Sequence, residues 1–163
     1  MPEENKPGSG GAPLREVVIP REDAVFRLDG RGYWRNRGGR FRKKKIVDYF
    51  HAAIDKDDGG YFVSQVKGDV LEKVYFPFED TALFVFGVRF EGDEIELVLN
   101  TGRRFTLDPR GLYIRGDCIY LNQDGERIKF SERAMMQLSP VLEEGGQGLY
   151  IRCNSERYLI PEY

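Results

Sequence analysis

The alternation of hydrophobic and polar positions predicts β-strands over the middle of the chain. Between Tyr61 and Leu107, β-branched and aromatic residues are concentrated in the runs "YFVSQV", "VLEKVYFPFE", "ALFVFGVRF", "EIELVLN" and "RRFTL". Turn sequences such as "EGDE" and "NTG" separate several of these runs. The run "EIELVLN" alternates and so buries one face, whereas "TALFVFGVRF" is apolar on both faces at its centre. We therefore expect a sheet of many strands with residues 81–90 in its middle.

Two segments have the spacing of amphipathic helices instead. Residues 43–54, "KKKIVDYFHAAI", carry apolar side chains at i, i+3, i+4, i+7 and i+8, which are Ile46, Tyr49, Phe50, Ala53 and Ile54. Residues 131–142, "SERAMMQLSPVL", predict a second helix in which Ser131 is the N-cap and Pro140 kinks or shortens the end. The acidic and glycine-rich turns "DKDDGG" and "EEGGQG" are expected to end the two helices.

A weak internal repeat connects the two ends of the chain. The stretch "FRLDGRG" (Phe26–Gly32) returns as "FTLDPRG" (Phe105–Gly111), but that spacing of 79 residues places the first helix on a strand pattern. A spacing of 87 to 88 residues aligns strand, turn, strand, helix, glycine turn and strand, although a chance alternation would give a similar pattern. We therefore predict an α+β fold: a mostly antiparallel, twisted sheet with two helices, built from two repeated strand-turn-strand-helix-strand motifs.

The same pattern divides the chain into three parts. Residues 1–13 are rich in proline, glycine and serine and predict a flexible tail. Residues 14–80 form the first β/α half and residues 81–163 the second, with the two halves packed as one structural unit. The junction between the halves is the default ligand site, because pockets favour such positions.

The order of several short motifs resembles a known family. An aspartate-glycine turn (Asp29-Gly30) precedes an aromatic strand (Tyr33-Trp34). A glycine, an apolar residue and a basic residue then lead into a helix (Gly39, Phe41 and Arg42). A second turn (Asp57–Tyr61) and an acidic element (Phe78–Leu83) follow. With the strand ending "LVLNTG", this order is similar to the bacterial domain-of-unknown-function 1285 family, well over residues 26–102 and loosely beyond. The resemblance implies an α+β fold with repeated motifs and a suggested part in signal transduction. It implies no established activity and no catalytic residues.

Composition limits the class of protein. A hydrophobic content of 40% supports a real core, and a formal net charge of -2 excludes a globally basic nucleic-acid binder. The two cysteines, Cys118 and Cys153, are too few for a disulfide framework and are expected to be reduced thiols. The start of the sequence does not resemble a signal peptide, and no run approaches the roughly 18 apolar residues of a membrane helix. We therefore expect a soluble, cytoplasmic protein without a membrane partner.

The most conspicuous charged segment runs from Arg27 to Lys45 with Asp29 as its single acid. Its basic residues and one aromatic residue form the candidate ligand- or anion-binding set: Arg35, Arg37, Arg40, Arg42, Lys43, Lys44, Lys45 and Trp34. Aromatic side chains among cations suit single-stranded nucleic acid, and lysines at a helix start suit a bound anion. A solvated basic face with the aromatic residues in the core explains the same pattern.

Other candidate chemistry is sparse. His51 is the only histidine, which excludes a multi-histidine zinc site, and its position on the first helix fits a partly buried packing residue. Residues 55–60 imitate the start of a calcium loop, but Val66 occupies the position of the bidentate glutamate. We expect no catalytic residues, no metal site and no cofactor.

The function itself stays open at this point. The first hypothesis is a non-catalytic cytoplasmic module that binds an unknown small molecule or protein partner, with signal transduction as the context that the resemblance implies. The alternative is polyanion or nucleic-acid binding through the basic stretch 35–45. A third hypothesis is an enzyme that uses His51 or a pair of carboxylates.

Overall fold

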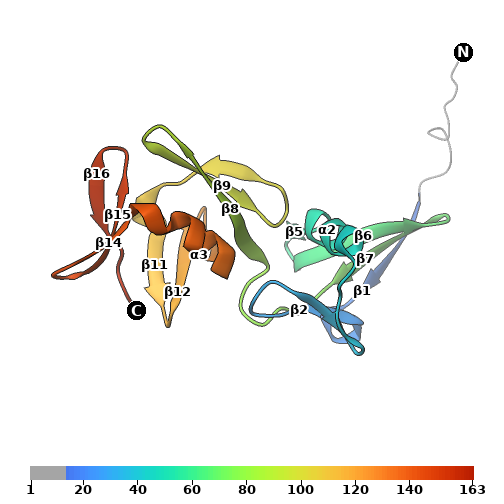
Figure 1. The fold of residues 1–163 in the computed structure, drawn as a ribbon. Coiled ribbons are helices and arrows are strands. Elements are labelled where there is room, and N and C mark those ends of the chain that lie inside the picture. Colours follow the sequence, from blue (N-terminus) through green and yellow to red (C-terminus); the bar gives the residue numbers. More distant parts are fainter. Residues whose placement is uncertain (1–13) are drawn as a thin grey trace, which may run out of the picture.

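A computed structural model describes residues 14–163, in which strands prevail over two helices (Figure 1). The predicted tail, residues 1–13, lies outside the described residues. A four-stranded sheet has the order β1 (Arg15–Ile19), β7 (Val70–Tyr75), β6 (Gly60–Lys67) and β5 (Asp55–Asp57). A separate three-stranded sheet contains β2 (Phe26–Leu28), β3 (Trp34–Asn36) and β4 (Gly39–Arg40). The 3-10 turn η1 (Arg21–Asp23) joins β1 to β2, and helix α2 (Lys44–Ala52) follows β4.

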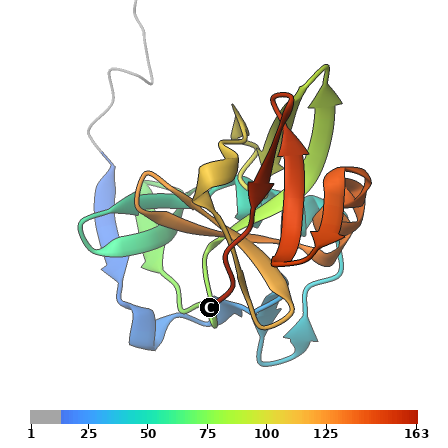
Figure 2. The same cartoon turned by 90° about the vertical axis from the view of Figure 1, so that its left-hand side faces the viewer.

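The later part of the chain forms two further sheets. The six-stranded sheet has the order β10 (Arg104–Thr106), β9 (Glu94–Leu99), β8 (Leu83–Glu91), β13 (Glu126–Phe130), β12 (Cys118–Gln123) and β11 (Leu112–Arg115). The three-stranded sheet contains β14 (Leu142–Gly145), β15 (Gly148–Cys153) and β16 (Glu156–Leu159), which stand in front in Figure 2. The remaining elements are helix α3 (Glu132–Leu138) and the 3-10 turns η2 (Pro109–Gly111) and η3 (Ser139–Val141).

The predicted central strand is confirmed. β8 lies inside the six-stranded sheet, antiparallel to β9 and parallel to β13, and its first three residues are buried. An apolar run of this kind suits a strand that is covered on both faces. The fold is therefore α+β with mostly antiparallel sheets, to which β1–β7 and β8–β13 add two parallel pairs.

The two predicted helices are also present, with one difference in how they end. Ser131 caps α3, since its hydroxyl oxygen accepts a hydrogen bond from the Ala134 amide at 3.1 Å. Pro140 stops that helix, which ends at Leu138 and continues as η3. The turns expected after the helices are partly strands, β5 and β14, because their glycines connect strand to strand. Among residues 14–163, no helix has both the length and the apolar character needed to cross a membrane.

The order of elements recurs along the chain. In both halves, a three-stranded meander, a helix and a second three-stranded meander follow one another. The pairing differs between the halves, because β13 joins β8 whereas β4 has only β3 beside it in the described residues. The structure therefore does not confirm the predicted repeat.

A buried polar network links the helix of the first half to the central strands. The Trp34 Nε1–H donates to Nδ1 of His51 at 3.2 Å, and Nδ2 of Asn100 lies 3.1 Å from the same nitrogen. The Asn100 amide also accepts from the Phe84 N–H and donates to the Ala82 carbonyl, at 3.0 and 3.1 Å. Since Nδ1 of His51 accepts, its ring proton resides on Nε2. His51 is thus fully buried and hydrogen-bonded rather than partly buried.

Burial keeps the imidazole of His51 neutral. Desolvation lowers the pKa of His51 from 6.5 to about 4, against smaller opposing effects of Asp48 and of a hydrogen bond to the Gly32 backbone. The unfolded chain therefore binds a proton on this residue at a higher pH than the folded chain does.

We expect the free energy of unfolding to fall as the pH drops from about 6.5 to about 4, because only the unfolded state protonates His51 in that window. Between pH 7 and pH 5 the loss amounts to about 2 kcal/mol. Urea unfolding of the wild type and of His51→Gln at both pH values measures it. Because there is no other histidine, an equal pH dependence in the two proteins would contradict the assignment.

Candidate functional site

A pocket of about 560 Å³ lies where the loop between β2 and β3 meets β8, β13 and α3. Its floor is apolar and is formed by Phe84, Phe86, Phe130 and Met135. The loop contributes Gly30, Arg31 and Tyr33, and the rim on the other side is formed by Lys129, Glu132 and Arg133. The pocket thus joins residues of the first half to residues of the second.

A glycine brings the loop against the floor of the pocket. Gly32 has a φ of +86°, and a Cβ atom built there would lie 3.3 Å from the Phe84 ring. Both the backbone conformation and the close approach favour glycine at this position. The loop therefore rests directly on the aromatic ring that the Asn100 amide holds through the Phe84 N–H.

Asp29 orders the same loop from within. Its Oδ1 accepts the backbone N–H groups of Arg31 and Tyr33, each at 2.9 Å, and its Oδ2 accepts Nε–H of Arg35 at 2.6 Å. The carboxylate is 5% exposed. Burial opposes its ionisation, but the hydrogen bonds from Arg35 and the two amides outweigh it and lower the pKa of Asp29. The loop is therefore preorganised.

A second carboxylate, that of Asp80, holds the lysine that is hydrogen-bonded to the loop. Asp80 accepts a hydrogen bond from the Tyr120 hydroxyl at 2.6 Å and pairs with Lys129 and Arg127 at 3.1 and 3.2 Å. Burial opposes its ionisation, but these groups lower the pKa of Asp80. The Lys129 ammonium group also donates to the Gly30 carbonyl at 2.7 Å. Lys129 therefore bridges β13 and the loop.

The outer rim carries more positive than negative charge. Arg31 lies 3.5 Å from Glu132 in an exposed ion pair, which contributes little to stability. Arg133 is exposed and has no ion-pair partner among residues 14–163. An aromatic floor beneath these guanidinium groups fits a ligand with an apolar body and an anionic end.

His51 lies behind the floor, in edge contact with Phe86 at 5.0 Å between ring centroids. Its Nδ1 accepts from the Trp34 side chain, and its other nitrogen is bonded to the Gly32 backbone. The imidazole therefore has no free nitrogen for a ligand. No group of histidine, cysteine or acidic residues in the described part of the chain could hold a metal ion.

The aromatic member of the predicted basic site is not at the surface. Trp34 is fully buried and packs against Phe26, Phe50 and Phe76, with ring centroids 5.8, 5.4 and 4.9 Å away. It cannot stack on a ligand in this arrangement. Its place in the core follows from β3, whose alternation directs Trp34 inward.

Some basic residues of that predicted site contact other side chains of the protein, and the others do not. Arg35 pairs with Asp29, the Arg40 guanidinium lies 4.3 Å from the Tyr33 ring centroid, and Lys44 pairs with Asp48 at 2.6 Å. The other four are exposed and have no ion-pair partner within residues 14–163: Arg37, Arg42, Lys43 and Lys45. Three of the seven cations thus contact side chains of the protein itself, and four are exposed without such a contact.

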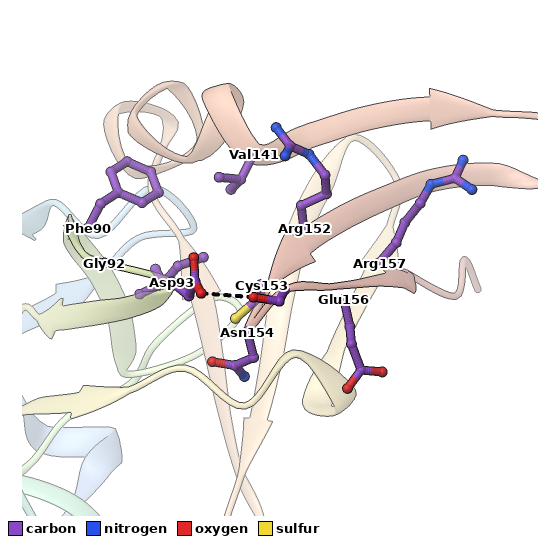
Figure 3. Close-up of a pocket in the computed structure, with 11 residues that line it drawn as sticks. Phe90, Gly92, Asp93, Val141, Arg152, Cys153, Asn154, Glu156 and Arg157 are labelled. Atoms are coloured by element: carbon purple, nitrogen blue, oxygen red, sulfur yellow. Dashed lines mark hydrogen bonds between the residues drawn. The ribbon is translucent and has the colours of Figure 1, made fainter.

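A second pocket, of about 310 Å³, lies between the β8–β9 turn and the β15–β16 turn (Figure 3). Arg152 and Arg157 point to the same side of their strands in Figure 3, and both pair with Glu143, at 2.6 and 3.4 Å. Cys153 is buried and unpaired, and burial raises the pKa of its thiol. Its two arginines already share the Glu143 carboxylate, and burial with a raised pKa disfavours the thiolate form of Cys153, so this pocket is the weaker candidate.

Two solved structures share the fold. The crystal structure of a DUF1285 family protein from Silicibacter pomeroyi DSS-3 matches with a TM-score of 0.59 and 13% identity, covering 94% of this chain and 89% of that chain. A DUF1285 family protein from Shewanella baltica OS155 matches with a TM-score of 0.50 and 19% identity, covering 71% and 91%. No protein-family model and no curated protein matches the sequence. The resemblance stated from the motifs is thereby confirmed at the level of the fold.

Sequence reasoning placed the ligand site between the halves but did not name its residues. Phe84 and Phe86 lie in the run that predicts the central strand, Asp80 precedes that strand, and Lys129 lies opposite Phe84 on β13. In the sequence, Asp29 stands among basic and aromatic residues, whereas Asp80 has no basic neighbour that would indicate its role.

We expect Arg35→Ala to lower the free energy of unfolding by about 1–2 kcal/mol, because it leaves the buried Asp29 carboxylate without its cation. The matched variant Arg37→Ala removes an exposed guanidinium from the same meander and should change stability by less than about 0.5 kcal/mol. Urea unfolding at pH 7 compares the two. Equal effects would show that the Asp29–Arg35 pair does not order the loop.

Proposed function

We propose that this protein is a non-catalytic binding module whose pocket between the two halves takes a small molecule with an apolar body and an anionic end. The aromatic floor beneath the exposed cations Arg31 and Arg133 is the observation that carries the proposal. The volume of the pocket falls in the range of about 300–1,000 Å³ that small-molecule sites have. The hydrogen-bonded anchors Asp29 and Lys129 preorganise the loop, which lowers the entropic cost of binding.

A ligand in this pocket would touch both the loop of the first half and helix α3 of the second. It would therefore stabilise one arrangement of residues 14–80 relative to residues 81–163. A partner protein could then bind that arrangement selectively. Support for a signalling role comes only from the family resemblance. The inaccessible ring of His51 favours a binding role over an enzymatic one.

Polyanion or nucleic-acid binding is the alternative function. The exposed and unpaired side chains Arg37, Arg42, Lys43 and Lys45 favour it. The burial of Trp34 weakens it, because the stretch then lacks its best stacking ring. Binding of this kind would weaken steeply with salt, in contrast to binding in an apolar pocket.

We further infer that the two halves are copies of one motif. Two parallel bridges support this, each joining the first strand of a meander to the segment after the last strand of its half: Leu28 to Phe78, and Ile114 to Glu162. Gly60 and Gly148 open corresponding strands with φ angles of 115° and 137°. The sequences "EKVYFP" and "ERYLIP" end the two copies with the same pattern.

We expect dodecanoate or 2-naphthyl phosphate to raise the melting temperature of the protein at both low and high salt, because the pocket supplies an apolar floor and a cationic rim. Met135→Trp should fill the pocket and weaken this binding at least tenfold. The matched variant Met136→Trp, at a side chain that is 75% exposed on the same helix, should leave it unchanged.

The same thermal-shift experiment includes heparin and short oligonucleotides. Stabilisation by these polyanions alone, lost at high salt and in a variant with Lys43, Lys44 and Lys45 neutralised, would overturn the pocket proposal in favour of the alternative.

A further inference from the structure

The edge of the sheet β2–β3–β4 continues into an extended segment before helix α2. The Phe41 N–H donates to the Trp34 carbonyl on the inner side, at 2.9 Å. The N–H groups of an extended strand alternate in direction, so the next one, of Arg42, points to the outer edge, and it donates to no acceptor within residues 14–163. An unpaired edge of this kind is a template for another strand.

The corresponding edge in the other copy is occupied. β13 pairs in parallel with β8, with Ile128, Lys129 and Phe130 opposite Leu83, Phe84 and Val85. The Ser131 N–H extends the ladder by donating to the Val85 carbonyl at 3.1 Å. A spacing of 87 residues maps β13 residues 128–130 onto residues 41–43 of the first copy.

The helices show the same contrast. On α3, Ala134 and Leu138 are fully buried, and the Gln137 side chain accepts the Val88 N–H of β8 at 2.9 Å. A spacing of 88 residues maps these three positions onto Ile46, Phe50 and Tyr49 of α2. Ile46 is 45% exposed and Tyr49 is 54% exposed. The helix face that β8 covers in one copy is uncovered in the other.

A groove adjoins this edge and is lined by Phe41 and Tyr49. It consists of two adjoining pockets, of about 20 and 270 Å³, which share Phe26, Phe50, Gln65 and Val74 between α2, β2 and strands β6 and β7. The groove also contains Ala53. Ala53 and Gln65 correspond to Val141 and Cys153, which line a pocket together with Phe90 at the end of β8.

We propose that this groove binds a β-strand of a partner protein, which pairs in parallel with residues 41–43 and covers Ile46 and Tyr49. The occupant is an extended segment with apolar residues at alternate positions, like β8, and with acidic residues beside them. The cations Arg42, Lys43 and Lys45 are exposed, have no ion-pair partner within residues 14–163, and lie on the edge segment and the first turn of α2, where they select the acidic residues. Main-chain hydrogen bonds supply affinity and the groove supplies specificity.

The first 13 residues do not supply the partner strand. Residues 1–13 contain no valine, isoleucine, leucine or aromatic residue, so they lack the side chains that the groove would bury. The inference depends on the proposed repeat but not on the pocket between the halves. Failure of the small-molecule proposal would therefore leave it standing.

The test uses a peptide of residues 80–91, "DTALFVFGVRFE", extended by three aspartates, because this sequence fills the corresponding groove in the second half. Amide hydrogen exchange measured by NMR should slow at least tenfold at Arg42, whose N–H lies on the outer edge and corresponds to that of Lys129, when the peptide is bound. The variant Ile46→Asp should weaken binding at least tenfold, whereas Met136→Asp, which places the same charge on the exposed face of α3, should not.

Several results would overturn the proposal. They include absence of protection at Arg42, equal binding by the two aspartate variants, and equal binding of a scrambled peptide. Loss of binding in Met135→Trp would place the peptide in the other pocket and would also overturn it. Tyr49→Asp gives the same test through a second exposed side chain if Ile46→Asp does not fold.

Discussion

One nitrogen atom, Nδ1 of His51, accepts hydrogen bonds from two buried donors, and the surrounding structure depends on it. The donors come from Trp34 on β3 and from Asn100 in the turn after β9, which are far apart in the sequence. In a low-dielectric interior each donor left without an acceptor costs about 1–3 kcal/mol, so the imidazole must stay neutral and in place. Through Asn100 the network holds the Phe84 backbone, and through Gly32 it holds the loop above that ring. The buried network therefore determines the positions of Phe84 and of the loop that line the pocket.

A buried carboxylate, Asp29, and a half-buried one, Asp80, account for part of the basic character of the chain. Asp29 and Asp80 stay ionised because guanidinium and ammonium groups and backbone amides surround them. Arg35 and Lys129 are paired with these carboxylates, so their charges are not available to bind an anionic ligand. The sequence pattern of cations thus combines internal counter-ions with a smaller set of exposed charges around residues 37–45.

Periodicity was enough to predict the strands, both helices, the Ser131 cap and the central place of β8, because these features depend on neighbouring residues. It was not enough to decide whether Trp34 binds a ligand or packs in the core beneath a solvated basic face, or to place Asn100, which reads as part of a turn in "LVLNTG". Their burial is decided by contacts with residues 17 and 49 positions away along the chain. The parallel pairing of β8 with β13 is a long-range contact of the same kind. The residues of the pocket depend on that pairing and could not be named without it.

Trp34 is the single tryptophan of the chain, and its indole N–H is bonded to the single histidine. An indole shielded from water fluoresces at short wavelength, and a protonated imidazole beside it quenches that emission. The protein therefore carries one optical reporter, placed at the junction of helix α2 with the central strands. The emission wavelength of Trp34 reports whether the core is open to water, and its emission intensity reports whether His51 is protonated. Neither measurement needs a label attached to the protein.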